Sequence, residues 1–108
     1  MAYNLVLADR LREAIRKFPV TEKKMFGGVG FLLNGNMLVG VHGDNLIVRV
    51  GPGNDRTSLA KPHTKPFDLT GHPMSGWVEV LPAGLINDNE LIVWVKGSLD
   101  FVSTLPTK

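Results

Sequence analysis

The 108-residue sequence predicts a single α+β domain over residues 1–108, built as a two-layer sandwich. Near both ends of the chain, apolar residues recur every three or four positions, the spacing of an amphipathic helix. Between these ends, short alternating runs are separated by turn residues such as Asn34-Gly35, a pattern typical of antiparallel strands. The predicted order is α-β-β-β-α-β-β-α, with an antiparallel sheet and its helices mainly on one face.

The first helix begins after Asn4, whose side chain is suited to accept a hydrogen bond from a free N–H of the first turn. Pro19 ends this helix, because proline disfavours helical geometry in the residue before it. The apolar stripe expected to face the core comprises Leu7, Ala8, Leu11, Ala14, Ile15 and Phe18.

Three strands are predicted next, over residues 25–33, 37–42 and 46–50. Asn34-Gly35 joins the first two, because both central positions of a type I′ turn need a positive φ. Residues 43–45 form a second cluster of turn-forming residues. Strands joined by such short turns must run antiparallel.

The middle of the chain is less regular. A short helix is predicted over residues 56–60, after Gly51-Pro52-Gly53. Residues 61–76 contain three prolines and two glycines, and we expect a loop there with a short strand at 67–69. A further strand is predicted at 77–81.

The last helix starts at a capping box, in which Asn87 is followed three residues later by Glu90. Pro106 ends it. Its apolar stripe consists of Leu91, Trp94, Val95, Leu99, Val102 and Leu105.

Strand alternation sorts the strand residues onto two faces, because successive side chains point to opposite sides of a sheet. One set is wholly apolar and is predicted to lie under the helices: Met25, Val29, Phe31, Leu33, Met37, Val39, Val41, Leu46, Val48, Val50, Val78 and Val80. The other set is mixed: Phe26, Gly28, Gly30, Leu32, Leu38, Gly40, His42, Ile47, Arg49, Trp77, Glu79 and Leu81. This second face is too apolar to be freely solvated. We therefore expect something to cover this face. The candidates are loop 61–76, a second copy of the chain or another protein partner, and a small ligand.

Composition excludes several classes of protein. Because there is no cysteine, disulfides, thiolate zinc sites and cysteine nucleophiles are absent. The formal net charge is +2 and the pI is near 9.2, which is mild for a nucleic-acid-binding domain. The apolar run at 91–95 is far shorter than the roughly 20 residues of a membrane span. Asp9 and Arg10 interrupt any signal peptide, so a cytoplasmic location is expected.

Catalytic and metal-binding motifs are not recognised. The spacing of His42, His63 and His72 matches no metal motif, so we expect no metal or other cofactor. No Gly-x-Ser-x-Gly elbow is present, and the chain is predicted not to be an enzyme. Residues 10–24 are rich in arginine and lysine, which favours a solvated helix face over a surface that tracks phosphates.

Several short motifs occur in one order along the chain: Lys23-Lys24-Met25-Phe26-Gly27-Gly28, Asn34-Gly35-Asn36-Met37, Val48-Arg49-Val50-Gly51, Lys61-Pro62-His63, Gly71-His72-Pro73-Met74 and Gly76-Trp77-Val78. In this combination the chain resembles, over nearly its whole length, the stand-alone N-terminal domain of the TfoX/Sxy family of bacterial competence regulators. The resemblance implies a two-layer α+β fold, a regulatory or interaction role, and no catalytic residues. Full-length members carry a second, helical domain suited to nucleic-acid contacts. This sequence does not include it, so we expect weak nucleic-acid binding or none.

These observations predict a non-enzymatic, cytoplasmic interaction module that uses the mixed face of its sheet. Its expected anchors are Phe26, Leu38, Ile47 and Trp77, with Arg49 providing polar specificity. A homodimer is the expected assembly, because a two-fold contact needs only one self-complementary surface, and the identity of any other protein partner is left open.

Two alternatives are kept. In the first, the cleft beside loop 61–76 binds a small anionic ligand, with Arg49, His63 and His72 as its expected contacts and Lys24 as a further polar candidate. In the second, the chain is a nucleic-acid accessory protein that uses basic residues 10–24.

Overall fold

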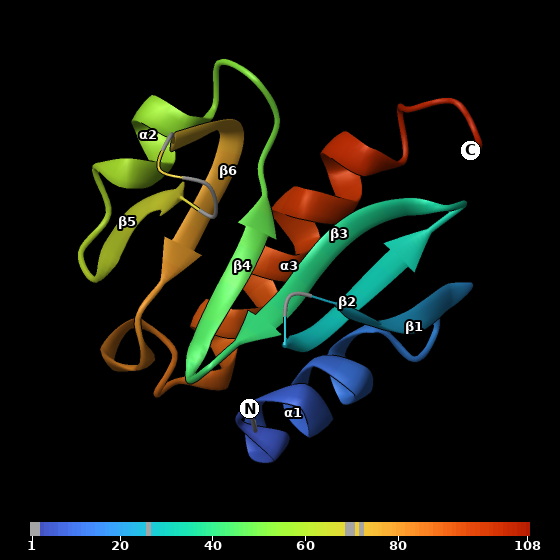
Figure 1. The fold of residues 1–108 in the computed structure, drawn as a ribbon, viewed down its shortest axis with the longest axis horizontal. Coiled ribbons are helices and arrows are strands. Elements are labelled where there is room, and N and C mark those ends of the chain that lie inside the picture. The colour runs from blue at the N-terminus through green and yellow to red at the C-terminus, as the bar shows by residue number, and fades with distance from the viewer. Residues whose placement is uncertain (1–2, 26, 69–70, 72) are drawn as a thin grey trace.

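The computed structural model describes residues 3–25, 27–68, 71 and 73–108. Its elements, labelled in Figure 1, are α1 (Leu5–Ile15), β1 (Val20–Met25), β2 (Gly28–Leu33), β3 (Asn36–His42), β4 (Asn45–Arg49), α2 (Asp55–Leu59), β5 (Thr64–Asp68), β6 (Pro73–Val80), a 3-10 turn η1 (Pro82–Gly84) and α3 (Asp88–Val102).

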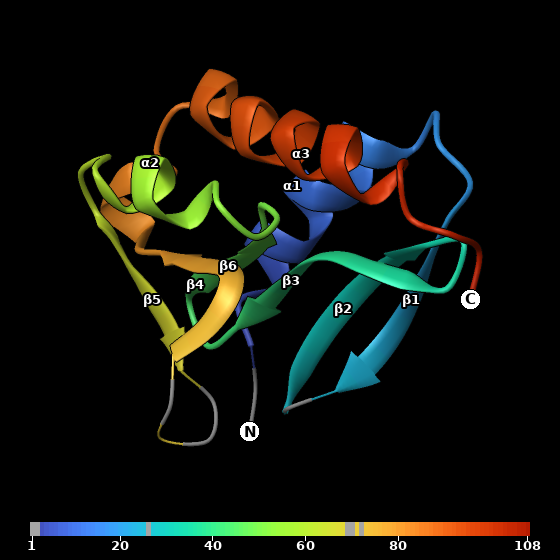
Figure 2. The same cartoon turned by 90° about the horizontal axis from the view of Figure 1, so that it is seen from above.

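The strands form one sheet in the order β1-β2-β3-β4-β6-β5, and every neighbouring pair is antiparallel. Figure 2 shows all three helices on one side of this sheet. The predicted α+β class is therefore confirmed, and the predicted elements follow one another in the predicted order. The structure adds one strand, β1, before them.

Strand β1 is an edge strand that pairs only with β2, with Met25 opposite Gly28 and Val20 opposite Leu33. The predicted first strand, 25–33, was therefore too long at its start, because a hairpin turn separates Met25 from Gly28. Gly27 in that turn has φ +73, a conformation that glycine adopts at little cost. The turn also places Met25 on the helix-free face, opposite to the face predicted for it.

Asn34-Gly35 forms the predicted turn between β2 and β3. The two residues have φ values of +53 and +83, as a type I′ turn requires. The C-terminal segment packs on this turn, because the Lys108 N–H donates to the Asn34 carbonyl over 2.8 Å. A side-chain N–H of Asn36 also donates to the Pro106 carbonyl over 2.9 Å, so the end of the chain is fastened to the start of β3.

The hydrophobic core lies between the sheet and helices α1 and α3. Asn4 caps α1 as predicted, since its side chain accepts from the Leu7 N–H over 2.9 Å. Asn87 caps α3 by accepting from the Asn89 N–H over 2.7 Å. The largest core side chains with almost no exposure are Leu11, Phe31, Leu38, Val39, Val41, Leu46, Val48, Val78, Val80 and Leu91.

A β-bulge in β3 changes which residues face the core. The β2–β3 register pairs Phe31 with Val39 but Leu32 with Met37, so Leu38 is the extra residue. As a result Leu38 and Val39 both pack in the core, and Met37 lies on the other face. The buried Ser98 hydroxyl of α3 donates to the Leu38 carbonyl over 2.9 Å. Leu38 was therefore wrongly predicted on the helix-free face, and Met37 wrongly under the helices.

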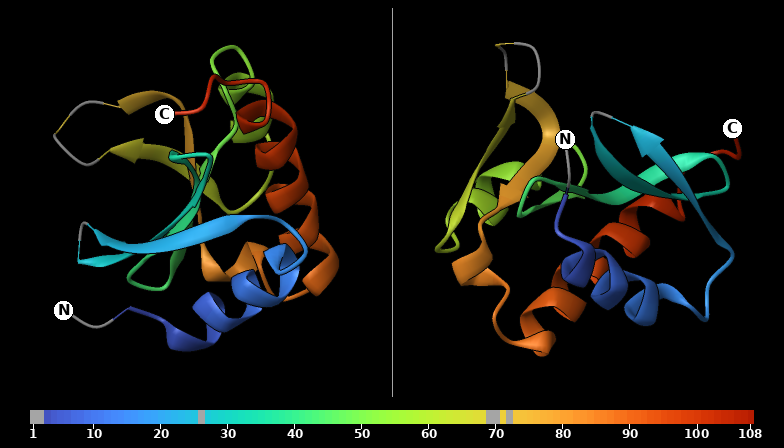
Figure 3. Two further views of the ribbon diagram at one scale, coloured as in Figure 1. Left: turned by 90° about the vertical axis from the view of Figure 1, so that its right-hand side faces the viewer. Right: turned by 60° about the horizontal axis from the view of Figure 1, so that its bottom comes forward.

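The sheet is strongly curved. In Figure 3 the β1–β2 and β5–β6 hairpins both bend away from the helices, with β3 and β4 between them. The helix-free side of the sheet is consequently concave, and we call it the open face. Its side chains come from alternate residues of all six strands.

Candidate functional site

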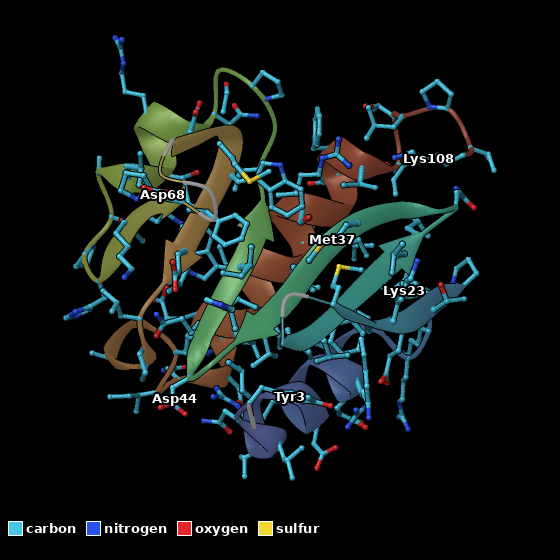
Figure 4. All side chains as sticks on the ribbon, in the orientation of Figure 1. Tyr3, Lys23, Met37, Asp44, Asp68 and Lys108 are labelled. Atoms are coloured by element: carbon cyan, nitrogen blue, oxygen red, sulfur yellow. The ribbon has the colours of Figure 1, made fainter. Side chains whose placement is uncertain are left out.

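The strand register arranges the open face in lateral rows. One row crosses the whole sheet from edge to edge: Lys23, Gly30, Gly40, Ile47, Glu79 and Lys65. Lysines therefore stand at both ends of the row, and a pair of glycines lies near its middle. Figure 4 shows the side chains of this face and labels Lys23 at one edge.

Two methionines lie over the glycine pair. A Cβ added to Gly30 would sit 2.9 Å from the Met25 sulfur and 3.3 Å from the Met37 terminal methyl. A Cβ on Gly40 would sit 2.7 Å from the same Met37 methyl. Both methionines are half-buried, and Figure 4 shows Met37 near the centre of the face. Because methionine is unbranched and flexible, this part of the face is able to adapt its shape to an apolar contact.

An aromatic group covers the part of the face nearest β5. The Phe67 ring lies 6.0 Å from the Trp77 ring and 6.5 Å from the His42 ring, centroid to centroid. Phe67 and Ile47 are each only 1% exposed, although neither belongs to the core under the helices. The sequence left three candidates for what covers this face. The chain's own segment 61–76 covers part of it, through Phe67 of β5.

One carboxylate is buried on this face. Glu79 is 7% exposed, and the Asn45 side-chain N–H donates to its Oε2 over 2.6 Å. The two residues lie on neighbouring strands, β6 and β4. The hydrogen bond offsets part of the cost of removing this side chain from water.

Arg49, at the end of β4, lies between two aromatic rings. Its guanidinium carbon is 5.4 Å from the Trp77 ring centroid and 5.8 Å from that of Phe101. Two glycines make this arrangement possible. A Cβ on Gly51 would lie 2.6 Å from the Phe101 ring, and one on Gly76 would lie 3.0 Å from the backbone at Gly51. We call Arg49, Trp77 and Phe101 the arginine clamp.

The six strands of the sheet, the open face and most of the buried core belong to residues that one family profile covers. The profile of the TfoX N-terminal domain matches residues 14–102.

The chain belongs to the TfoX N-terminal domain family. The resemblance found in the sequence is therefore confirmed. A search of curated proteins finds no match.

Within this TfoX N-terminal domain, the structure brings together only part of the predicted interaction face. Ile47, Arg49 and Trp77 share the open face, but Ile47 is covered and the other two are half-buried. Leu38 belongs to the core because of the bulge. Phe26 and His72 lie outside the described residues.

The proposed polar residues are scattered. Lys24 is exposed on the edge strand β1. His63, with a φ of +62, lines a cavity of about 550 Å³ together with Glu90 and Trp94 of α3. Arg49 does not line that cavity. Arg49 and His63 therefore do not share this cavity, and the predicted anion site stays a prediction.

Three of the six basic residues of 10–24, the arginines, are paired with acids. Arg10 contacts Asp88 at 2.9 Å, and Arg12 reaches Glu22 at 3.0 Å. Arg16 approaches Glu13 at 3.4 Å. The hydrogen bond from Arg12 lowers the pKa of Glu22 below its ordinary value. These pairs reduce the positive charge that the segment offers to a phosphate backbone, and weak nucleic-acid binding stays a prediction.

The described residues form neither a metal-binding cluster nor a membrane-spanning helix. Among residues 3–25, 27–68, 71 and 73–108, no group of three or more histidine or acidic side chains is placed to hold a metal ion. The helices within these ranges include none long and apolar enough to span a membrane.

Sequence reasoning missed two features. Met25 and Met37 were assigned to the core, because alternation was followed through the turn at Gly27 and through a bulge that leaves no mark in the sequence. It also missed an apolar strip on the outer side of the helices, whose side chains are between 46% and 83% exposed: Phe18, Ile86, Ile92 and Val93. The strip was detectable, since Ile92 and Val93 fall outside the stripe of α3 that packs on the sheet.

Proposed function

We propose that the domain is a cytoplasmic regulatory module of the TfoX type, which acts by binding another protein through its open face. One observation carries this proposal. The open face combines adaptable apolar side chains with an arginine whose donors are unoccupied by any described residue. Apolar anchors and arginine are the groups enriched where proteins bind one another.

The shape of the face supports recognition of a chain segment. Because the β1–β2 and β5–β6 hairpins bend to the same side, they flank the strip formed by β3 and β4 (Figure 3). Beneath the two methionines, Gly30 of β2 and Gly40 of β3 present backbone without side chains, which allows close approach of a bound segment. An apolar side chain that displaces Met25 or Met37 would pack directly on the backbone of the two glycines.

Binding in place of catalysis is proposed because the acidic groups near the face already have structural roles. Glu79 is held by Asn45, and Asp68 accepts from the Gly71 N–H over 2.6 Å. Asp55 accepts from the Gly76 N–H over 3.1 Å, which lowers its pKa. The lowered pKa of Asp55 makes its carboxylate a poor general base, since its proton affinity is reduced.

The test compares two matched variants in capture experiments from host lysate. Met37→Glu places a charge on the open face, and Val93→Glu places the same charge on the outer surface of α3. We expect one set of proteins to be retained by the wild type and Val93→Glu but lost with Met37→Glu. Loss with Val93→Glu and retention with Met37→Glu would assign recognition to the helices and reject the proposal. Circular dichroism must first show that both variants are folded.

A second surface favours self-association. The exposed apolar strip of Phe18, Ile86, Ile92 and Val93 borders two cavities, one lined by Phe18 and Ile92 and the other by Ile86 and Val93. We propose this strip, and not the open face, as the contact of the homodimer. Light scattering at about 100 μM, above the Kd of a stable interface, tests it. The wild type should be a dimer and Val93→Glu a monomer. A dimer broken by Met37→Glu instead would return the contact to the open face.

A further inference from the structure

Arg49 carries unused hydrogen-bonding capacity. A guanidinium has five N–H donors and no acceptor. Among the described residues, no carboxylate forms an ion pair with Arg49, and its only described partners are the Trp77 and Phe101 rings. The four ion pairs formed by described residues use Arg10 and Arg12 of α1 and its C-cap residue Arg16 instead. Arg49 is thus a half-buried cation with no anionic partner among the residues that the structure describes.

The clamp holds this cation in place before any partner binds. Two rings lie within 6 Å of the guanidinium carbon, and Phe101 is itself fixed against the backbone of Gly51. Arginine stacked on aromatic rings keeps its planar edge free for in-plane hydrogen bonds. Because little rotational freedom remains to be lost, a planar, bidentate anion is the ligand that this geometry suits best.

Lysines add positive charge at the two ends of the central row, whereas the exposed carboxylate of Asp68 on β5 already accepts from the Gly71 N–H. Lys23 and Lys65, at the two ends of the central row, form no ion pair with any described residue. The carboxylate in that row, Glu79, is buried and held by Asn45. The accessible charges of the row are therefore cationic, while its middle is apolar.

We propose that the partner bound by the open face is an acidic peptide segment of another protein. A carboxylate side chain of this segment pairs with Arg49 in the clamp, and a neighbouring apolar side chain packs on Met25 and Met37. Acidic residues towards its ends face Lys23 and Lys65. The proposal rests on the proposed function, because it names the partner of the same face.

The experiment uses two synthetic peptides with blocked ends and the ¹⁵N-labelled full chain. In the first peptide two glutamates alternate with three leucines, and in the second glutamines replace the glutamates. We expect the acidic peptide to bind about tenfold more tightly at low salt, as charge-assisted hydrogen bonds allow. It should shift the Arg49 side-chain Nε–H and the Trp77 indole N–H. Added salt should reduce the preference.

Three variants separate the contribution of the clamp from general charge. Arg49→Gln should lose most of the preference and keep only the part due to Lys23 and Lys65. Arg49→Lys should keep more of it, but less than the wild type, because an ammonium lacks the planar fork. Arg56→Gln removes an exposed arginine of α2 and should leave the tenfold preference unchanged. If Arg56→Gln weakens binding as much as Arg49→Gln, the attraction is nonspecific and the proposal fails.

The outcomes distinguish this proposal from the proposed function. Equal binding of both peptides to the open face would reject the acidic partner and leave open-face recognition standing. Shifts confined to α1 and α3 would reject both. If neither peptide shifts a resonance at about 1 mM, any dissociation constant lies above that of typical transient contacts, and the acidic partner is rejected. The capture experiment alone then decides the proposed function.

Discussion

Replacing Gly51 by alanine should both strain the backbone and disturb the arginine clamp. Gly51 has φ +95, a conformation that costs a residue with a side chain about 1–3 kcal/mol. The new Cβ would lie 2.6 Å from the Phe101 ring, well inside van der Waals contact. Overpacking of this kind costs about 1–3 kcal/mol. The expected total loss of unfolding free energy is therefore about 2–6 kcal/mol.

Gly53→Ala is the matched control. Gly53 has nearly the same backbone conformation, with φ +89, but no atom lies within 4 Å of its added Cβ. The control should thus lose only the backbone contribution of about 1–3 kcal/mol. In urea denaturation, with a slope of about 2 kcal/mol/M, the two midpoints should differ by about 0.5–1.5 M.

The double variant Gly51→Ala with Phe101→Ala completes the cycle. Removing the ring removes the overlap, so the two substitutions together should cost less than the sum of their separate effects. The reasoning is refuted if Gly51→Ala and Gly53→Ala are equally stable, or if the two effects at Gly51 and Phe101 simply add.

Three further predictions concern stability. Ser98→Ala should lose about 1 kcal/mol of unfolding free energy in urea denaturation, because its buried hydroxyl donates to the Leu38 carbonyl in the bulge. Ser103→Ala removes an exposed hydrogen bond and should change little. Equal losses would contradict this. Asn45→Ala should cost about 1–3 kcal/mol by leaving the buried Glu79 carboxylate unpartnered, and melting temperatures check it. The pKa of Glu22 is lowered in the folded state, so its ion pair stabilises above the ordinary pKa of 4.5, and that stability is lost as the pH falls through the lowered value. The difference in unfolding free energy between wild type and Glu22→Gln, measured by urea denaturation, should therefore shrink as the pH falls from 4.5 through the lowered pKa. A difference that stays constant with pH would contradict this.

Turns and helix starts that depend on one or two neighbouring residues could be predicted from the sequence. The Asn34-Gly35 turn needs only two residues with positive φ, and the caps of α1 and α3 need only an asparagine beside the first turn. Strand β1 was not predicted, because Thr21 to Lys24 is a polar run without alternation. Such a run forms a strand only because β2 offers it an edge to pair with.

The candidate site was less predictable than the fold. Met37, Leu38 and Val39 are all apolar, so the sequence contains nothing that shows which of them is the extra residue of the bulge. Phe67 lies in a segment rich in proline and glycine, where its packing on Trp77 depends on the pairing of β5 with β6. Arg49 and Trp77 were correctly placed on one face by alternation. Phe101 was not, because it approaches them from α3, more than fifty positions after Arg49.

The two ends of the sheet have a consequence for solubility at high concentration. An open antiparallel sheet presents unpaired backbone groups along both margins, and such margins invite other molecules to add strands without limit. Here β1 carries Lys23 and Lys24 along one margin. On the other margin, the carbonyl of His63, just before β5, accepts from the Leu81 N–H and so points towards β6. Because backbone groups alternate along a strand, those of Pro66 point outward, and proline has no N–H to donate there. Growth into fibrils is thereby discouraged at both margins, while the interior of the curved surface stays free for a specific contact.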